Sequence, residues 1–123
     1  MKRVLITISR TYSRWDTVVR ALARVADELH GEEIVLVHGD NPSGDRHVAR
    51  IARNLFRWTL EPHPAQWRRN GVYNPQAGLL RNHEMTALGA DVCLAFIDKG
   101  SAGASHCARI AEEAGIPVRR YET

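Results

Sequence analysis

The sequence predicts a doubly wound α/β fold, with one mainly parallel sheet of five strands and helices on both faces. Short apolar, β-branched segments alternate with longer segments that repeat apolar residues at helical spacing. The apolar segments are nearly continuous, which is typical of strands buried on both faces. Four strand–helix units followed by a last strand are the order expected for a parallel sheet joined by helical crossovers.

The first half of the chain contributes three strands and two helices. Val4–Ile8 is the first strand, and Ser13 with Asp16 predicts a capping box for a helix that ends at Gly31. Residues 34–37 form the second strand, and residues 58–61 form a shorter third strand that stops before a proline. Between these two strands lies a turn-rich loop and then a helix with its apolar face at Val48, Ile51, Ala52 and Leu55.

The second half adds two more helices and two strands. Residues 65–74 are predicted to be a loop, after which Asn74 and Pro75 provide the N-cap and first position of a helix that runs to Gly89. Residues 91–97 form the fourth strand and residues 103–114 the last helix. The final strand starts at residues 116–118.

Composition indicates one ordinary globular domain that spans residues 1–123. The chain is 44% hydrophobic and 25% charged. Cys93 and Cys107 show no metal-ligand or redox spacing, and the six histidines show no paired spacing, so we expect no metal site and no cofactor. No apolar run is long enough to span a membrane, and the start of the chain lacks signal-peptide features. We expect a cytoplasmic protein without membrane contact.

The charge of the chain permits an anionic partner. The formal net charge is +3, and Lys2 and Lys99 are the only lysines among seventeen cationic side chains. The guanidinium fork of arginine suits phosphate and carboxylate groups. GC-rich coding would produce the same bias, so composition alone does not identify a ligand.

The loops after the first, second and fourth strands are where a doubly wound sheet binds its ligand. Backbone amides and helix N-termini in such loops can bind phosphate. Capping of the following helix, a plain turn or a surface arginine would explain the same residues. The candidates for ligand binding are Ser9 and Arg10 in the first loop, Gly39, Ser43, Gly44 and Asp45 in the second, and Ser101, Gly103 and Ser105 in the fourth.

Arg81 is the most informative single residue. Helical spacing places it on one face with Gly78, Met85 and Leu88, among residues that we expect to be buried. A buried charge needs a partner, because desolvation without one costs several kcal/mol. Either a nearby carboxylate, Glu84 or Asp91, pairs with it, or an anionic ligand does, and we favour the ligand.

Two further features have alternative explanations. Arg46, Arg50, Arg53 and Arg57 follow one face of the second helix and could track a nucleic-acid backbone, although a solvated face explains them as well. No aromatic residues alternate with these arginines to stack on bases. Trp67 could cover a flat ligand or pack in the core.

Together these pieces resemble the YspA/cpYpsA-related branch of the SLOG superfamily, over nearly the whole chain. The resemblance implies a Rossmann-like fold and a nucleotide or nucleotide-derived ligand, in a branch that is common in bacteria and their phages. The superfamily includes the Smf/DprA DNA-processing proteins and the Lonely Guy phosphoribohydrolases. The segments that carry the resemblance are Arg3–Thr7, Ser9-Arg10, the loop from His38-Gly39 to Gly44-Asp45, His63-Pro64-Ala65-x-Trp67, Gly78-x-x-Arg81-Asn82-x-x-Met85, Ala90-Asp91-x-x-x-Ala95-Phe96 and Ser101-x-Gly103.

The chain departs from the family pattern at three places. Ile8 stands where the family has glycine, which restricts how closely a ligand approaches the backbone. Residues 40–43 replace the small residues usual in the second loop, and Asp40 adds a negative charge there. Cys107 stands where Lonely Guy hydrolases carry their glutamate, with Ala104 at their threonine, and a thiol on an apolar face cannot replace that carboxylate.

These residues and the resemblance suggest three functions. The first is binding or sensing of a nucleotide-like small molecule, in which Arg10 and Arg81 contact phosphate and Asn82 or Asp45 contacts ribose or base. The second is an N-glycosidic hydrolase or transferase acting on nucleotides, in which Glu84, Asp91 or Asp98 is the acid, base or nucleophile. The third is DNA binding through the arginines of the second helix. By resemblance to the superfamily we also expect a homodimer. We favour the first function.

Overall fold

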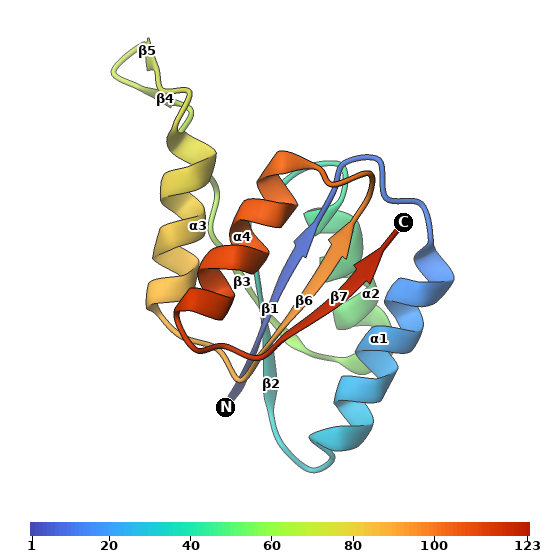
Figure 1. The fold of residues 1–123 in the computed structure, drawn as a ribbon. Helices are drawn as coiled ribbons and strands as arrows, with labels where there is room; N and C mark the ends of the chain where they lie inside the picture. The colour runs from blue at the N-terminus through green and yellow to red at the C-terminus, as the bar shows by residue number, and fades with distance from the viewer.

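The computed structural model describes all of residues 1–123 and confirms the α/β fold with its five-stranded sheet (Figure 1). Four helices alternate with the strands of this sheet, and two further short strands form a hairpin. The elements in chain order are β1 (Lys2–Ile8), α1 (Trp15–Glu28), β2 (Ile34–His38), α2 (Asp45–Phe56), β3 (Thr59–Pro62), β4 (Arg68–Arg69), β5 (Val72–Tyr73), α3 (Ala77–Ala87), β6 (Val92–Ile97), α4 (Ala102–Glu113) and β7 (Val118–Glu122).

All neighbouring strands of the main sheet are parallel, in the order β3-β2-β1-β6-β7. The chain builds outward from β1 to the edge strand β3 and then returns to the other side of β1 at β6. The strand order therefore reverses between β1 and β6, where Ile8 pairs with Phe96. Figure 1 shows the carboxyl ends of the strands and the N-terminal ends of α3 and α4 at the same end of the molecule.

Alternation along β1 divides the core into two layers. Val4 and Ile6 pack against Val18 and Leu22 of α1 in the larger cluster, which also includes residues of α2. Leu5 faces the opposite side and packs with side chains of α3 and α4. Burying an aliphatic side chain of this size stabilises a fold by about 1.5–3 kcal/mol, so both layers hold the sheet rigid behind its carboxyl edge.

The structure corrects the prediction that residues 65–74 are a loop without secondary structure. Two-residue strands, β4 and β5, pair antiparallel there and project beyond α3 (Figure 1). Asn70 and Gly71 both have positive φ, 52° and 79°, as a two-residue hairpin turn requires. The dipeptide Asn-Gly is the signal that predicts this turn.

Two predicted helix starts also differ. Ser13 and Asp16 do not form a capping box, because α1 begins after Arg14 and Asp16 instead pairs with Arg20 at 2.7 Å. Helix α3 begins at Ala77 rather than at Pro75, since the Asn74 side chain accepts a hydrogen bond from the backbone of Gln76 at 2.9 Å. No helix in the structure combines the length and the apolar character that crossing a membrane requires.

Candidate functional site

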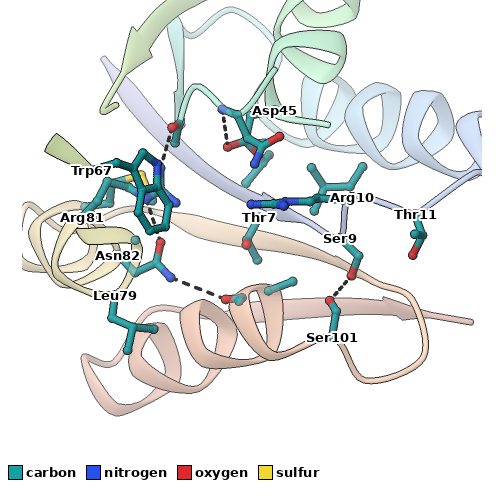
Figure 2. Close-up of a pocket in the computed structure, with 18 of the residues that line it drawn as sticks. Thr7, Ser9, Arg10, Thr11, Asp45, Trp67, Leu79, Arg81, Asn82 and Ser101 are labelled. Carbon is teal, nitrogen blue, oxygen red and sulfur yellow. Dashed lines mark hydrogen bonds between the residues drawn. The ribbon is translucent and has the colours of Figure 1, made fainter. Parts of the chain in front are cut away.

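The largest hollow of the molecule lies at the carboxyl edge of the sheet, where the strand order reverses. Its volume is about 420 Å³, within the usual range for small-molecule sites. Figure 2 shows its walls, which come from the end of β1, the β2–α2 loop and the N-terminal parts of α3 and α4. The lining residues are Ile6, Thr7, Ile8, Ser9, Arg10, Thr11, Gly39, Asn41, Asp45, Trp67, Pro75, Gly78, Leu79, Arg81, Asn82, Met85, Ser101, Gly103 and Ala104.

Ser9 and Ser101 join the end of β1 to the start of α4. Their hydroxyl groups are hydrogen-bonded to each other, and Ser9 Oγ accepts a second bond from the backbone N–H of Asp98 at 2.9 Å. Ser101 is the N-cap residue of α4, yet its side chain makes no bond to the helix. The backbone N–H groups of Gly103 and Ala104 therefore have no protein acceptor, and both residues line the pocket. This uncapped helix end is the kind of site that binds anions.

Arg81 extends from α3 into the pocket and is half-buried. Its Nη1 donates to the carbonyl oxygen of Gly39 at 2.5 Å and, at 3.4 Å, to that of His63. Its Nε donates to Asn82 Oδ1 at 3.0 Å, while Nη2 has no partner in the protein. No carboxylate oxygen lies within 4 Å of this guanidinium, and neither Glu84 nor Asp91 pairs with it. Its charge is solvated by carbonyl dipoles and is not neutralised by an ion pair.

The helix face that carries Arg81 is only partly buried. Met85 is buried as expected from the spacing, but Leu88 is 57% exposed because it follows the last residue of α3. Asn82 is buried, and its side-chain Nδ2 lies 3.3 Å from His106 Nδ1 and 3.5 Å from the Gly103 carbonyl oxygen. Asn82 therefore holds the Arg81 guanidinium and links α3 to α4.

Asp45 is the one carboxylate that lines the pocket, and it is almost fully buried. Its Oδ2 accepts a hydrogen bond from the backbone N–H of Asn41 at 3.2 Å. Burial raises the pKa of Asp45 above the usual aspartate value, although the bond from Asn41 and the positive charge of Arg81 partly offset this effect. A side chain on Gly39 would collide with Arg81 and would come within 2.9 Å of Asp45 Oδ2.

Arg10 brings a second guanidinium to the pocket. It follows β1, and Figure 2 shows its side chain extending into the hollow. It makes no hydrogen bond or ion pair with the protein. Arg10 is therefore free to contact a ligand without breaking an existing interaction.

The opposite end of the pocket is aromatic and apolar. Trp67, which is 40% exposed, lines it together with Pro75, Gly78 and Leu79. Trp67 stacks on Tyr73 of the hairpin, with ring centroids 6.2 Å apart and 15° between the planes. A Cβ on Gly78 would lie 3.1 Å from Trp67 Cη2, so the indole rests closely against the start of α3.

Several predicted binding residues lie outside the pocket lining. Gly44 packs against Ile8, and the Ser43 hydroxyl donates to Asn41 Oδ1 at 2.7 Å. Ser105 lies on α4 beyond the lining residues. Asp40 turns away from the pocket and pairs with Arg46 at 3.0 Å.

The three predicted acid–base candidates do not line the pocket either. Glu84 is exposed on α3. Asp91 accepts a hydrogen bond from the backbone of Arg3 at 2.7 Å, at the amino end of the sheet. Asp98 accepts hydrogen bonds from the hydroxyls of Thr11, at 2.5 Å, and Thr123, at 2.6 Å. The structure does not bring these carboxylates together.

Some lining residues were not among the predicted candidates. Thr7, Thr11 and Asn41 carry polar side chains that belong to the same two loops as Ser9 and Gly39, and position in the loop was the available signal. No group of three or more histidine, cysteine or acidic side chains is arranged to hold a metal ion. Burial raises the pKa of the Cys107 thiol to about 11, which keeps this side chain neutral.

Known proteins that are similar in sequence add to this geometry. The family model of the YspA, cpYpsA-related SLOG family matches residues 2–70, more than half of the chain. The chain belongs to this SLOG family. The match includes Ser9, Arg10 and the β2–α2 loop, whereas Arg81 and α4 lie beyond it. Membership indicates a nucleotide-related ligand-binding or ligand-modifying role.

One curated relative extends the similarity over the whole chain. The Gene 61 protein of Mycobacterium phage D29 is 46% identical over 127 residues, which cover 98% of this chain and 97% of the relative. Its name does not indicate a specific function. No solved structure gives a significant match to this SLOG protein.

Proposed function

We propose that this SLOG protein binds a nucleotide-like small molecule in the pocket at the carboxyl edge of its sheet. The observation that carries the proposal is the division of the pocket into a cationic, amide-lined side and an aromatic side. Phosphate oxygens bind Arg10, Arg81 and the N-terminal amides of α4. The base lies against Trp67.

The cationic side supports a phosphate. Arg10 has no protein partner, and Arg81 keeps Nη2 free for a ligand oxygen. A half-buried guanidinium without a carboxylate partner is stabilised when an anion neutralises it. The free N–H groups of Gly103 and Ala104 add donors at the positive end of the α4 dipole.

The aromatic side supports a planar base. Stacking of a base on an aromatic side chain contributes about 1–3 kcal/mol, and the indole of Trp67 offers the largest aromatic surface of the pocket. Tyr73 holds Trp67 from the hairpin, so the ring is preorganised. A simple sugar phosphate would leave this side of the pocket unfilled.

The test compares fragments of a nucleotide. Calorimetry would measure binding of adenosine 5′-monophosphate, adenosine and ribose 5-phosphate to the wild type, Trp67→Leu and Arg10→Gln. We expect Trp67→Leu to weaken the nucleotide about tenfold while ribose 5-phosphate changes little, and Arg10→Gln to weaken both phosphates but not adenosine. Repeating the titrations with the guanosine, cytidine and uridine monophosphates covers other bases. Absence of binding to all four monophosphates at millimolar concentration would contradict the proposal.

An enzymatic alternative rests on Asp45. It is buried in the pocket with a raised pKa, as a general acid or nucleophile at an N-glycosidic bond would be. Release of free base from the nucleoside monophosphates, abolished by Asp45→Asn, would favour hydrolysis over simple binding. Intact nucleotide after prolonged incubation would leave binding as the function.

A further inference from the structure

A second hollow lies outside the pocket, between α2 and the edge strand β3. Its volume is about 280 Å³. We call it the α2 arginine groove; its lining residues are His38, Asp40, Arg46, Ala49, Arg50, Arg53, Leu60 and Pro62. It shares no lining residue with the pocket, although the β2–α2 loop contributes to both.

The excess positive charge of the chain is concentrated at this groove. Residues 45–57 hold four of the seventeen cationic side chains and one of the fourteen acidic ones, so the remainder of the chain is electrically balanced. The single acidic residue of this segment, Asp45, is buried against the other pocket. The outer face of α2 therefore carries all of the formal net charge of +3.

The arginines of α2 also lack the partners that arginines of other helices have. On α1, Arg20 pairs with Asp16 and Arg24 with Glu28, and on α4, Arg109 pairs with Glu113. On α2, Arg46 pairs with Asp40, which occupies the only acidic side chain of the groove. The three arginines that follow it on the same face have no carboxylate oxygen within 4 Å; these are Arg50, Arg53 and Arg57.

The other wall of the groove adds no negative charge. Leu60 and Pro62 of β3 face α2, while the intervening Glu61 makes its bonds with Arg3 and His63. The pKa of His38 is lowered by burial, and its Nδ1 accepts a hydrogen bond from the backbone N–H of Asp40 at 3.0 Å. An anion in the groove would thus meet guanidinium groups above a neutral floor.

The spacing of the arginines favours a linear polyanion. Residues 46, 50, 53 and 57 lie on one face and span about 16 Å along the helix axis. This length exceeds a single phosphate and calls for a chain of regularly spaced charges. A concave groove fits a strand better than a planar membrane surface, and guanidinium groups bind phosphates with two parallel hydrogen bonds.

We propose that the α2 arginine groove binds the phosphate backbone of a nucleic-acid strand, independently of the nucleotide pocket. No aromatic side chain lines the groove, so contacts are to phosphates and the binding is not sequence-specific. Each of Arg50 and Arg53 replaces one or more counterions on the strand. Binding therefore weakens steeply as salt rises.

The experiment measures fluorescence anisotropy of a labelled 30-nucleotide single strand of mixed sequence, titrated with protein between 50 and 200 mM salt. The test variant is Arg50→Gln/Arg53→Gln. The matched control is Arg20→Gln/Arg24→Gln, which removes the same charge from an adjacent helix. We expect the test variant to bind roughly tenfold more weakly and to lower the log–log salt slope by about 2, while the control stays within about threefold of the wild type.

Three results would overturn the proposal. The wild type could fail to retain the strand at 50 mM salt, or both variants could lose affinity equally, which would indicate net charge alone. Equal or tighter binding to polyglutamate, or to vesicles containing anionic phosphatidylglycerol, would assign the groove to an acidic protein or a membrane instead. Circular dichroism of each variant confirms that the fold is retained.

Discussion

The guanidinium of Arg81 fills the space that a side chain on residue 39 would need. Its Nη1 donates to the Gly39 carbonyl oxygen, so helix α3 and the β2–α2 loop meet at a backbone position without a Cβ. Gly39 does not have a positive φ, and its requirement is one of space and not of backbone conformation. This contact sets the shape of the pocket.

Gly39→Ala is therefore expected to displace Arg81. Overpacking of this kind costs about 1–3 kcal/mol, and the variant should unfold at lower urea and bind nucleoside monophosphates more weakly. Gly103→Ala is the matched control, because Gly103 lines the same pocket and a Cβ there meets nothing within 4 Å. Equal stability of the two variants would show that the Arg81 contact is not fixed.

A second steric prediction concerns Gly44 and Ile8. A Cβ on Gly44 would lie 2.7 Å from Ile8 Cγ2, so Gly44→Ala should destabilise the protein by about 1–3 kcal/mol. Ile8→Ala removes that methyl group, and the alanine at position 44 should then cost much less. A double-mutant cycle of urea denaturation measures this coupling, and additive effects would contradict the contact.

The pocket carboxylate predicts a pH dependence of ligand binding. Burial raises the pKa of Asp45, so the group loses its negative charge at a higher pH than an ordinary aspartate does. A phosphate should bind more tightly as pH falls through this pKa. Titrations of adenosine 5′-monophosphate from pH 7.5 to 4.5 should show that Asp45→Asn binds more tightly at pH 7.5 and that the difference from the wild type shrinks toward low pH. Comparison at equal pH cancels the ionisation of the ligand, and parallel profiles would exclude Asp45 as the cause.

The edge strand predicts a pH dependence of stability. Arg3 donates two 2.8 Å hydrogen bonds to Glu61, and these bonds, together with one to His63, lower the pKa of Glu61 to about 2. A carboxylate with a lowered folded-state pKa stabilises the protein above its unfolded pKa of about 4.5, and this contribution disappears as pH falls through 2.

Glu61→Gln should accordingly lower the urea midpoint at pH 6 and converge with the wild type near pH 2. Glu84→Gln, at an exposed glutamate without an ion pair, is the control and should have little effect at either pH. A constant difference between wild type and Glu61→Gln over this range would mean that the lost interaction is not ionic.

The sequence predicted the strands well because each is a continuous apolar run that a two-sided parallel sheet requires. Helix boundaries were less predictable, since Asp16 had the alternative of pairing with Arg20. The β4–β5 hairpin was missed because a two-residue strand leaves no periodic pattern, although Asn70-Gly71 marks its turn.

Predicting the site was limited by contacts between distant segments. Helical spacing correctly brought Arg81 to the interior, but its partners are carbonyl oxygens 42 and 18 residues away, which no local pattern reveals. Asp98 is drawn to the hydroxyls of Thr11 and Thr123, one from near each end of the chain, for the same reason. The loops at the strand ends, in contrast, follow from topology and were expected to form the pocket.

The most direct test of nucleotide binding in this pocket is calorimetric titration of adenosine 5′-monophosphate into Arg81→Gln and into Arg109→Gln, an arginine of α4 that does not line the pocket. Loss of a hydrogen bond to a charged group costs about 1.5–3 kcal/mol, so Arg81→Gln should bind at least about tenfold more weakly than the wild type. Arg109→Gln should bind like the wild type. Unchanged affinity in a folded Arg81→Gln protein would contradict the assignment of Arg81 to the phosphate.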